Sequence, residues 1–156
     1  MSKSGSGLFS GTSGNEYKDE KFAYSNNEPT AVVWEKIAPT AQNYPGTEIP
    51  RSFIVDVPST KHNPEGKLWT HGNATEHMHE ALTSIKDNPR LKVSNPNLYS
   101  QFILYDYYKA LNAVCRGEIN YNRTYRIGNW EFAFSEARSG QKYPVVKHAL
   151  FTGFKE

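Results

Sequence analysis

The segment NWEFAFS at residues 129–135 constrains the fold more than any other part of the chain. Large aromatic residues alternate along it with smaller or polar ones: Trp130, Phe132 and Phe134 against Glu131, Ala133 and Ser135. Successive strand residues point to opposite faces of a sheet, so the aromatic side must be covered by other elements. The segment therefore predicts a strand in a sheet with one covered face and one open face.

Other segments have the pattern of further strands and of helices. Strands are expected at residues 52–57, 67–71, 123–127 and 143–151, the first two as one hairpin. Helices are expected from Asn73 to Asp87-Asn88-Pro89 and from Asn95-Pro96 to Gly117. This order predicts a two-layer α+β protein, with helices packed on one face of an antiparallel sheet.

Local signals set the ends of these elements. Asn73, with Glu76 three residues later, has the pattern of a capping box at the start of the first helix. The second helix is so apolar that we expect it to be the central buried one. Gly128 and Asn129 form a two-residue turn typical of a tight hairpin between residues 123–127 and 129–135.

The 156 residues are expected to form one domain preceded by an extension. Residues 1–47 begin with a Gly- and Ser-rich stretch and are interpreted as a flexible linker and N-terminal extension, and residues 48–156 as the folded domain. The single cysteine, Cys115, excludes an internal disulfide and lies in an apolar helical stretch, so it is expected to be a packed structural residue. No apolar run predicts a membrane span.

The charges are distributed unevenly along the chain. Residues 1–60 contain five Lys and Arg against seven Asp and Glu, whereas residues 61–156 contain thirteen against nine. The first part therefore carries a charge of −2 and the second +4. A basic C-terminal part is compatible with a phosphate-bearing partner, and equally with an ordinary charged surface.

The stretch PVVKHALF at residues 144–151 raises a specific question. A strand suited to the core is interrupted by the adjacent polar residues Lys147 and His148. Strand alternation predicts that one of them lies on the open face and the other toward the helices or an edge. The stretch then either lines a site or forms an edge strand protected by charge.

Histidine and basic residues in the C-terminal part suggest acid–base chemistry on a phosphodiester. Cleavage of RNA without a metal needs one group to remove the 2′-hydroxyl proton, another to protonate the leaving 5′-oxygen, and cations for the transition state. Histidine suits both proton transfers because its pKa lies near neutrality. The candidates are His71, beside a predicted helix N-terminus, His148, Lys147, Arg138 and Glu131. Helix capping, packing or ordinary surface positions are the alternative roles.

Other chemistries have weaker support. His77 and His79 lie about 200° apart around a helix and cannot chelate one ion together. The sequence contains no GxSxG, P-loop or GxGxxG motif. We therefore predict neither a metal nor another cofactor.

Three of these stretches carry a family resemblance. LWTHGNATEHMHEAL, NWEFAFSEAR and YPVVKHALF resemble the C-terminal toxin domains of bacterial polymorphic toxins, the interbacterial effectors of LXG-type or contact-dependent systems. The family pattern reads approximately WxHPNATxHM, WExxFSxxR and PVVxHA. The match spans roughly residues 48–151, with Gly72 in place of the family's Pro.

The resemblance implies a ribonuclease of the barnase/EndoU/colicin/RelE type, delivered by a producing bacterium and active in the target-cell cytoplasm. It also implies an immunity protein that covers the site, an RNA substrate such as tRNA, and room for a host factor. The motif positions in this sequence are His71, Asn73, Thr75 and His77, then Trp130, Glu131 and Arg138, then Lys147 and His148.

From this set, His71 and His148 are predicted to transfer protons, with His77 as a reserve candidate. Glu131 would act as a base or orient a histidine. Arg138 and Lys147 would bind phosphate, and Asn73 and Thr75 would contribute to RNA binding. Two other functions remain open: a metal-dependent nuclease or DNase, with His71, His77 and an acidic residue as ligands, and a non-catalytic module that binds nucleic acid or another protein.

Overall fold

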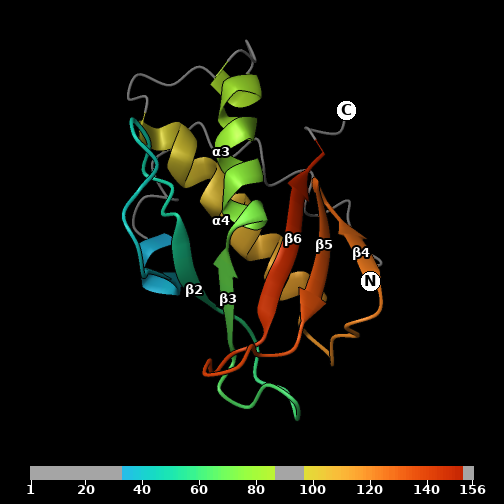
Figure 1. Ribbon diagram of the computed structural model, residues 1–156. Coiled ribbons are helices and arrows are strands. Elements are labelled where there is room, and N and C mark those ends of the chain that lie inside the picture. Colours follow the sequence, from blue (N-terminus) through green and yellow to red (C-terminus); the bar gives the residue numbers. More distant parts are fainter. Residues whose placement is uncertain (1–32, 87–96, 153–156) are drawn as a thin grey trace.

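A computed structural model describes residues 33–86 and 97–152 of the chain (Figure 1). Its centre is a six-stranded sheet with the strand order β1-β2-β3-β6-β5-β4. The strands are β1 (Ile37–Pro39), β2 (Ser52–Asp56), β3 (Lys67–His71), β4 (Thr124–Ile127), β5 (Trp130–Ser135) and β6 (Val145–Phe151). The main helices are α3 (Asn73–Lys86) and α4 (Asn97–Val114). The α+β class predicted from the sequence is confirmed.

Both predicted hairpins are present. β2 and β3 pair antiparallel with Ser52 opposite His71, as expected from the alternation in the two segments. β4 and β5 are joined by the two-residue turn Gly128-Asn129, so Ile127 pairs with Trp130. Gly128 has a φ of 59°, a left-handed conformation that glycine adopts without a steric penalty and that this class of turn requires.

The prediction of a wholly antiparallel sheet is wrong at one pair of strands. β3 and β6 run parallel, with Trp69 opposite Val145 and Thr70 opposite Val146. Two helices and the β4–β5 hairpin separate them in the sequence, and a connection of that length allows the chain to return in the same direction. The sheet is therefore mixed, with the parallel pair at its centre (Figure 1).

The sheet has two distinct faces. The inner face carries buried side chains from four strands: Phe53, Val55, Leu68, Thr70, Phe132, Phe134 and Val146. Tyr107 of α4 contacts Phe53 and Phe132 of this face edge-on and donates or accepts a 2.6 Å hydrogen bond with Thr70. The other face, here called the outer face, carries the half-buried residues Ser52, Ile54, Trp69, His71, Glu131 and His148.

The folded part extends further toward the N-terminus than the boundary predicted at residue 48. β1 pairs with β2, and Val33 and Ile37 are buried in the same hydrophobic core. Residues 1–32 of the predicted extension lie outside the described residues. So do the predicted stop at Asp87-Asn88-Pro89 and the predicted start at Asn95-Pro96.

The end of α4 differs from the prediction, whereas the burial of the cysteine that follows it agrees with the prediction. α4 ends at Val114, three residues before the predicted stop at Gly117. Cys115 is buried, and its burial raises the pKa of the thiol to about 12, which agrees with a packed structural cysteine. In the described part of the chain, neither helix has the length and apolar character needed to cross a bilayer.

Candidate functional site

A β-bulge explains why Lys147 interrupts an otherwise core-like strand. Ala133 of β5 pairs with His148 of β6, but the next residue, Phe134, pairs with Val146, so Lys147 is an extra residue without a pairing partner on β5. The bulge breaks the alternation: Lys147 is exposed, and His148 lies on the outer face with Ala133. Strict alternation therefore does not hold across this pair, and Lys147 is exposed rather than buried against the helices.

The edge-strand interpretation of the same segment is also wrong. β6 lies between β3 and β5, in the middle of the sheet. A central strand has no free edge to protect by charge. Bulges are common beside functional sites, where they redirect a side chain, and this one directs an imidazole onto the outer face.

His148 belongs to a chain of polar contacts across three strands. Its Nε2 lies 3.2 Å from Oε2 of Glu131 on β5. The other carboxylate oxygen, Oε1, lies 3.1 Å from Nη2 of Arg126 on β4. A carboxylate bonded to one ring nitrogen fixes the tautomer and orientation of the ring. Nδ1 of His148 is therefore the nitrogen left for a substrate.

His77 approaches this group from α3. Its ring lies edge-on to that of His148, with 5.9 Å between the ring centroids, and its Nδ1 lies 3.2 Å from Oε1 of Glu80. His79 instead stacks on Tyr44, at a centroid distance of 4.6 Å. The two histidines of α3 point in different directions, as their spacing predicted.

His71 ends β3 on the outer face. Its ring stacks on that of Trp69 with the centroids 3.8 Å apart. Nε2 is shielded from solvent and has no hydrogen-bond partner among the described residues. Burial and the positive charge of Arg138 both lower the pKa of His71, so the ring is neutral near neutral pH. A neutral imidazole can accept a proton.

The parallel register brings the two predicted catalytic histidines to the same region. Thr70 pairs with Val146, and the following residues are His71 on β3 and Lys147 on β6. His148 is the next residue on β6 after the bulge. Within the described residues no ring contact joins His71 to His148, so a substrate group would have to lie between or beside them.

The remaining predicted residues have different positions. Arg138 lies in the exposed loop after β5 and is close enough to His71 to lower its pKa. Asn73 is exposed at the first residue of α3. Thr75 is fully buried, and its hydroxyl bonds to the carbonyl oxygens of Arg51 and Gly72. Thr75 has no surface for RNA, and we leave it out of the proposed site.

Sequence reasoning missed two residues of this region. Arg126 binds Glu131, and the two-residue turn at Gly128-Asn129 would have placed these residues opposite each other. Trp69 precedes His71 by two residues and shares its face of β3, a relation that strand periodicity alone would have suggested.

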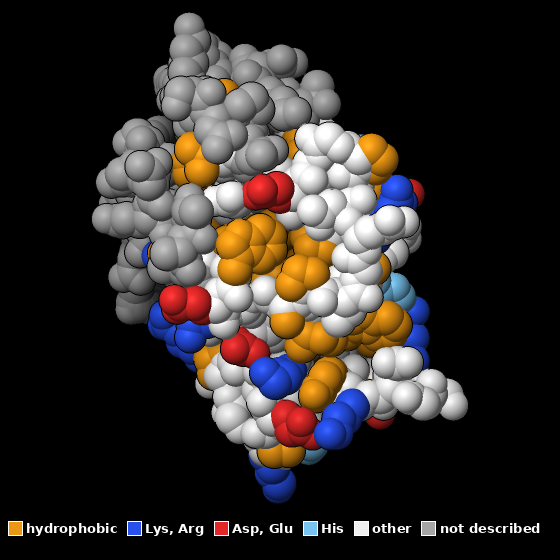
Figure 2. Space-filling model, turned by 90° about the vertical axis from the view of Figure 1, so that its left-hand side faces the viewer, with side chains coloured by type: hydrophobic (Ala, Val, Ile, Leu, Met, Phe, Trp, Pro, Cys, Tyr) orange, Lys and Arg blue, Asp and Glu red, His pale blue; other side chains and the backbone are white. Residues whose placement is uncertain are grey.

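The side of the molecule next to β1 and β2 carries charges of both signs (Figure 2). Figure 2 shows the side next to β1 and β2, where hydrophobic side chains gather and the visible acidic and basic side chains are intermixed rather than aligned in a basic stripe. The cations closest to the candidate histidines are Arg138, which lowers the pKa of His71, and Lys147, which precedes His148. In the part of the chain that the structure describes, no group of three His, Cys, Asp or Glu side chains is arranged to hold a metal.

The influence of Arg138 on His71 can be measured directly. Replacing Arg138 by glutamine removes the positive charge, so we expect the pKa of His71 to rise in an NMR titration of the histidine ring protons. The rise should stop short of the usual value, because burial still lowers the pKa. Lys142→Gln, in the same loop, is the matched control and should leave His71 unchanged. An unchanged pKa in Arg138→Gln would show that the two residues do not interact.

The chain was also compared with known proteins. No protein-family model matches the sequence, and no curated protein is significantly similar to it.

Proposed function

We propose that this protein is a metal-independent endoribonuclease, with tRNA as the expected substrate, and that it acts as an interbacterial toxin domain. The observation that carries the proposal is His148, oriented by Glu131 on the outer face and placed beside His77 and the end of β3 that bears His71. Imidazoles near exposed cations are the groups that metal-free cleavage of RNA requires.

Each proton transfer can be assigned to a residue. His71, neutral because its pKa is lowered, accepts the proton of the 2′-hydroxyl while the 2′-oxygen attacks the phosphorus. His148 gives a proton to the 5′-oxygen as the bond between phosphorus and that oxygen breaks. The products are a 2′,3′-cyclic phosphate and a free 5′-hydroxyl. His77, in contact with His148, is the alternative proton donor.

The cations would act on the phosphate. Lys147 is exposed at the bulge next to His148, and Arg138 lies near His71. Both can stabilise the negative charge that develops on the non-bridging oxygens in the transition state. Asn73, exposed at the first turn of α3, adds a hydrogen-bonding group at a helix N-terminus, where free N–H groups favour anions.

The biological setting rests on the sequence motifs. The motifs at His71, Glu131 and His148 resemble those of polymorphic toxins, and a helical layer against a sheet of the barnase/EndoU/colicin/RelE type is the finer fold that we propose. Such a domain is delivered by the producing bacterium and acts in the target-cell cytoplasm. Its partners would be RNA, a cognate immunity protein and, for some targets, a host factor.

The proposal is tested with the purified full chain and total tRNA in excess EDTA. We expect cleavage without added metal, products that end in a 2′,3′-cyclic phosphate, and no cleavage of a 2′-O-methylated RNA or of single-stranded DNA. Cleavage that requires magnesium or zinc, or that proceeds on DNA, would replace this proposal by a metal-dependent nuclease. Binding of RNA without any cleavage would favour the non-catalytic module.

A further inference from the structure

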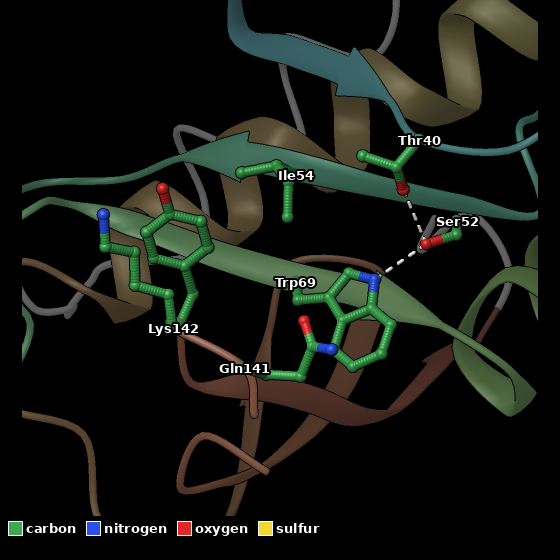
Figure 3. Close-up of a pocket in the computed structure, with 7 residues that line it drawn as sticks. Thr40, Ser52, Ile54, Trp69, Gln141 and Lys142 are labelled. Carbon is green, nitrogen blue, oxygen red and sulfur yellow. Dashed lines mark hydrogen bonds between the residues drawn. The ribbon is translucent and has the colours of Figure 1, made fainter. Parts of the chain in front are cut away.

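A pocket opens on the outer face next to His71. It has a volume of about 270 Å³ and lies between β2, β3 and the loop that precedes β6 (Figure 3). Its aromatic walls come from Trp69 and Tyr143, and Ile54 adds an aliphatic surface. The volume is slightly below the roughly 300–1,000 Å³ of pockets for drug-sized ligands, so the pocket is suited to a single ring system.

The polar groups of the pocket are of two kinds. The indole Nε1 of Trp69 donates to Oγ of Ser52 at 2.7 Å, and the Ser52 hydroxyl also bonds to Oγ1 of Thr40 at 2.7 Å (Figure 3). These contacts occupy the hydroxyls and fix the indole ring. The side-chain amide of Gln141, by contrast, has no hydrogen-bond partner among the described residues, and it carries both donors and an acceptor.

The pocket is linked to one candidate catalytic residue, His71, through Trp69. Trp69 lines the pocket and stacks on His71. At the rim, Nζ of Lys142 lies 3.7 Å from Oε2 of Glu65. This ion pair is exposed and therefore weak, so a phosphate can replace Glu65 as the partner of Lys142. A ligand ring in the pocket would therefore place its attached sugar and phosphate near His71.

We propose that this pocket binds one nucleobase of the RNA next to the cleaved phosphodiester, and that adenine fits it best. The proposal rests on the proposed ribonuclease function. Aromatic side chains such as Trp69 and Tyr143 bind bases through stacking or edge contacts. A glutamine amide pairs with the N6 and N7 edge of adenine through one donor and one acceptor, which assigns Gln141 to base selection.

The test uses nucleoside monophosphates, which bind without being cleaved. AMP, GMP, CMP and UMP are titrated into the full chain at millimolar concentrations, and the indole N–H signals are followed by NMR. We expect AMP to shift the Trp69 signal in a saturable manner, with an affinity about fivefold or more above that of UMP. Trp34 is exposed and lies outside the pocket, so its signal is the internal control.

Two variants make the test specific. Trp69→Leu lacks the reporting indole, so its AMP binding is followed through the NMR signals of AMP itself, as is that of the wild type for comparison; binding should weaken about 5- to 150-fold, the range expected when a stacking residue is removed. Gln141→Ala, a change at an exposed loop residue, should leave the fold intact and abolish the preference for AMP over UMP. Saturable binding unchanged in both variants, or no shift of the Trp69 signal by any nucleotide, would overturn the inference.

The outcomes separate this inference from the function on which it rests. RNA cleavage with full activity in Trp69→Leu and Gln141→Ala, and no nucleotide binding, would retain the ribonuclease and reject the base pocket. Nucleotide binding through Trp69 without RNA cleavage would retain the pocket and reject the ribonuclease. Occupation of the pocket only by a protein side chain of an immunity partner would likewise reject the base assignment.

Discussion

Replacing His148 by alanine is expected to lower the rate of RNA cleavage by about 10²–10⁴-fold, the usual contribution of a general acid or base. The ring is partly exposed, and among the described residues its side-chain hydrogen bond is to Glu131, so its removal should leave the fold intact. The measurement is the rate of tRNA cleavage in EDTA, with the midpoint of thermal unfolding as the check that the variant is folded.

The chain offers a matched control for this variant. His62 forms the same kind of pair, with its Nδ1 2.9 Å from Oε1 of Glu118, but in an exposed turn after β2. His62→Ala should therefore cleave RNA at the wild-type rate. Equal losses in both variants would mean that the effect is not specific to the site, and full activity in His148→Ala would remove His148 from catalysis.

Glu131→Gln separates orientation of the ring from proton transfer by the ring. The glutamine keeps the size of the side chain and one hydrogen bond to His148 but loses the charge that pairs with Arg126. A smaller loss of rate than in His148→Ala is expected, because the acid itself remains. A loss as large as that of His148→Ala would assign Glu131 a direct role in the chemistry.

The parts of the site that depend on neighbouring residues in the sequence could be predicted. The turn at Gly128-Asn129 fixes the register of β4 and β5, and this register alone aligns Arg126 with Glu131. The spacing of His77 and His79 already indicated that only one of them could join a given cluster. The residues in each of these pairs are close together in the sequence, so the geometry of a single turn or helix determines their relative positions.

The other parts depend on contacts between segments far apart in sequence. The parallel pairing of β6 with β3 depends on the packing of the helices and the β4–β5 hairpin that separate them in the sequence. No local sequence pattern specifies that packing. The bulge at Lys147 arises from matching β6 to the core residues of β5, with Val146 and Ala149 both buried. The strict alternation assumed for the segment could not reveal it.

Replacing Trp130 by alanine is expected to lower the free energy of unfolding by about 3–5 kcal/mol, as for other large aromatic residues in cores. The side chain is 1% exposed and contacts the rings of Tyr107, Phe132 and Phe151. Its Nε1 also donates to Oδ2 of the buried Asp106 at 3.0 Å, so the variant leaves a cavity and removes a donor from a buried carboxylate.

Urea unfolding followed by far-UV circular dichroism measures this loss, since the signal does not depend on the deleted indole. Trp34→Ala is the control: the residue is exposed, and its loss should cost less than about 1 kcal/mol. Trp130→Phe should fall between the two, because it keeps most of the ring volume and loses the hydrogen bond to Asp106. Equal stabilities of Trp130→Ala and Trp34→Ala would contradict the packing described here.

The Trp130 and His148 variants should also lose activity for different physical reasons, and an osmolyte separates them. Cleavage is therefore measured near the unfolding midpoint of Trp130→Ala, where a loss of about 3–5 kcal/mol out of the 5–15 kcal/mol typical of a domain lowers activity by lowering the folded fraction. Trimethylamine N-oxide favours the compact state, so it should restore RNA cleavage in Trp130→Ala. It should not restore cleavage in His148→Ala, where the protein is folded and the proton donor is missing. Restoration in both variants would show that His148 supports the fold rather than the chemistry.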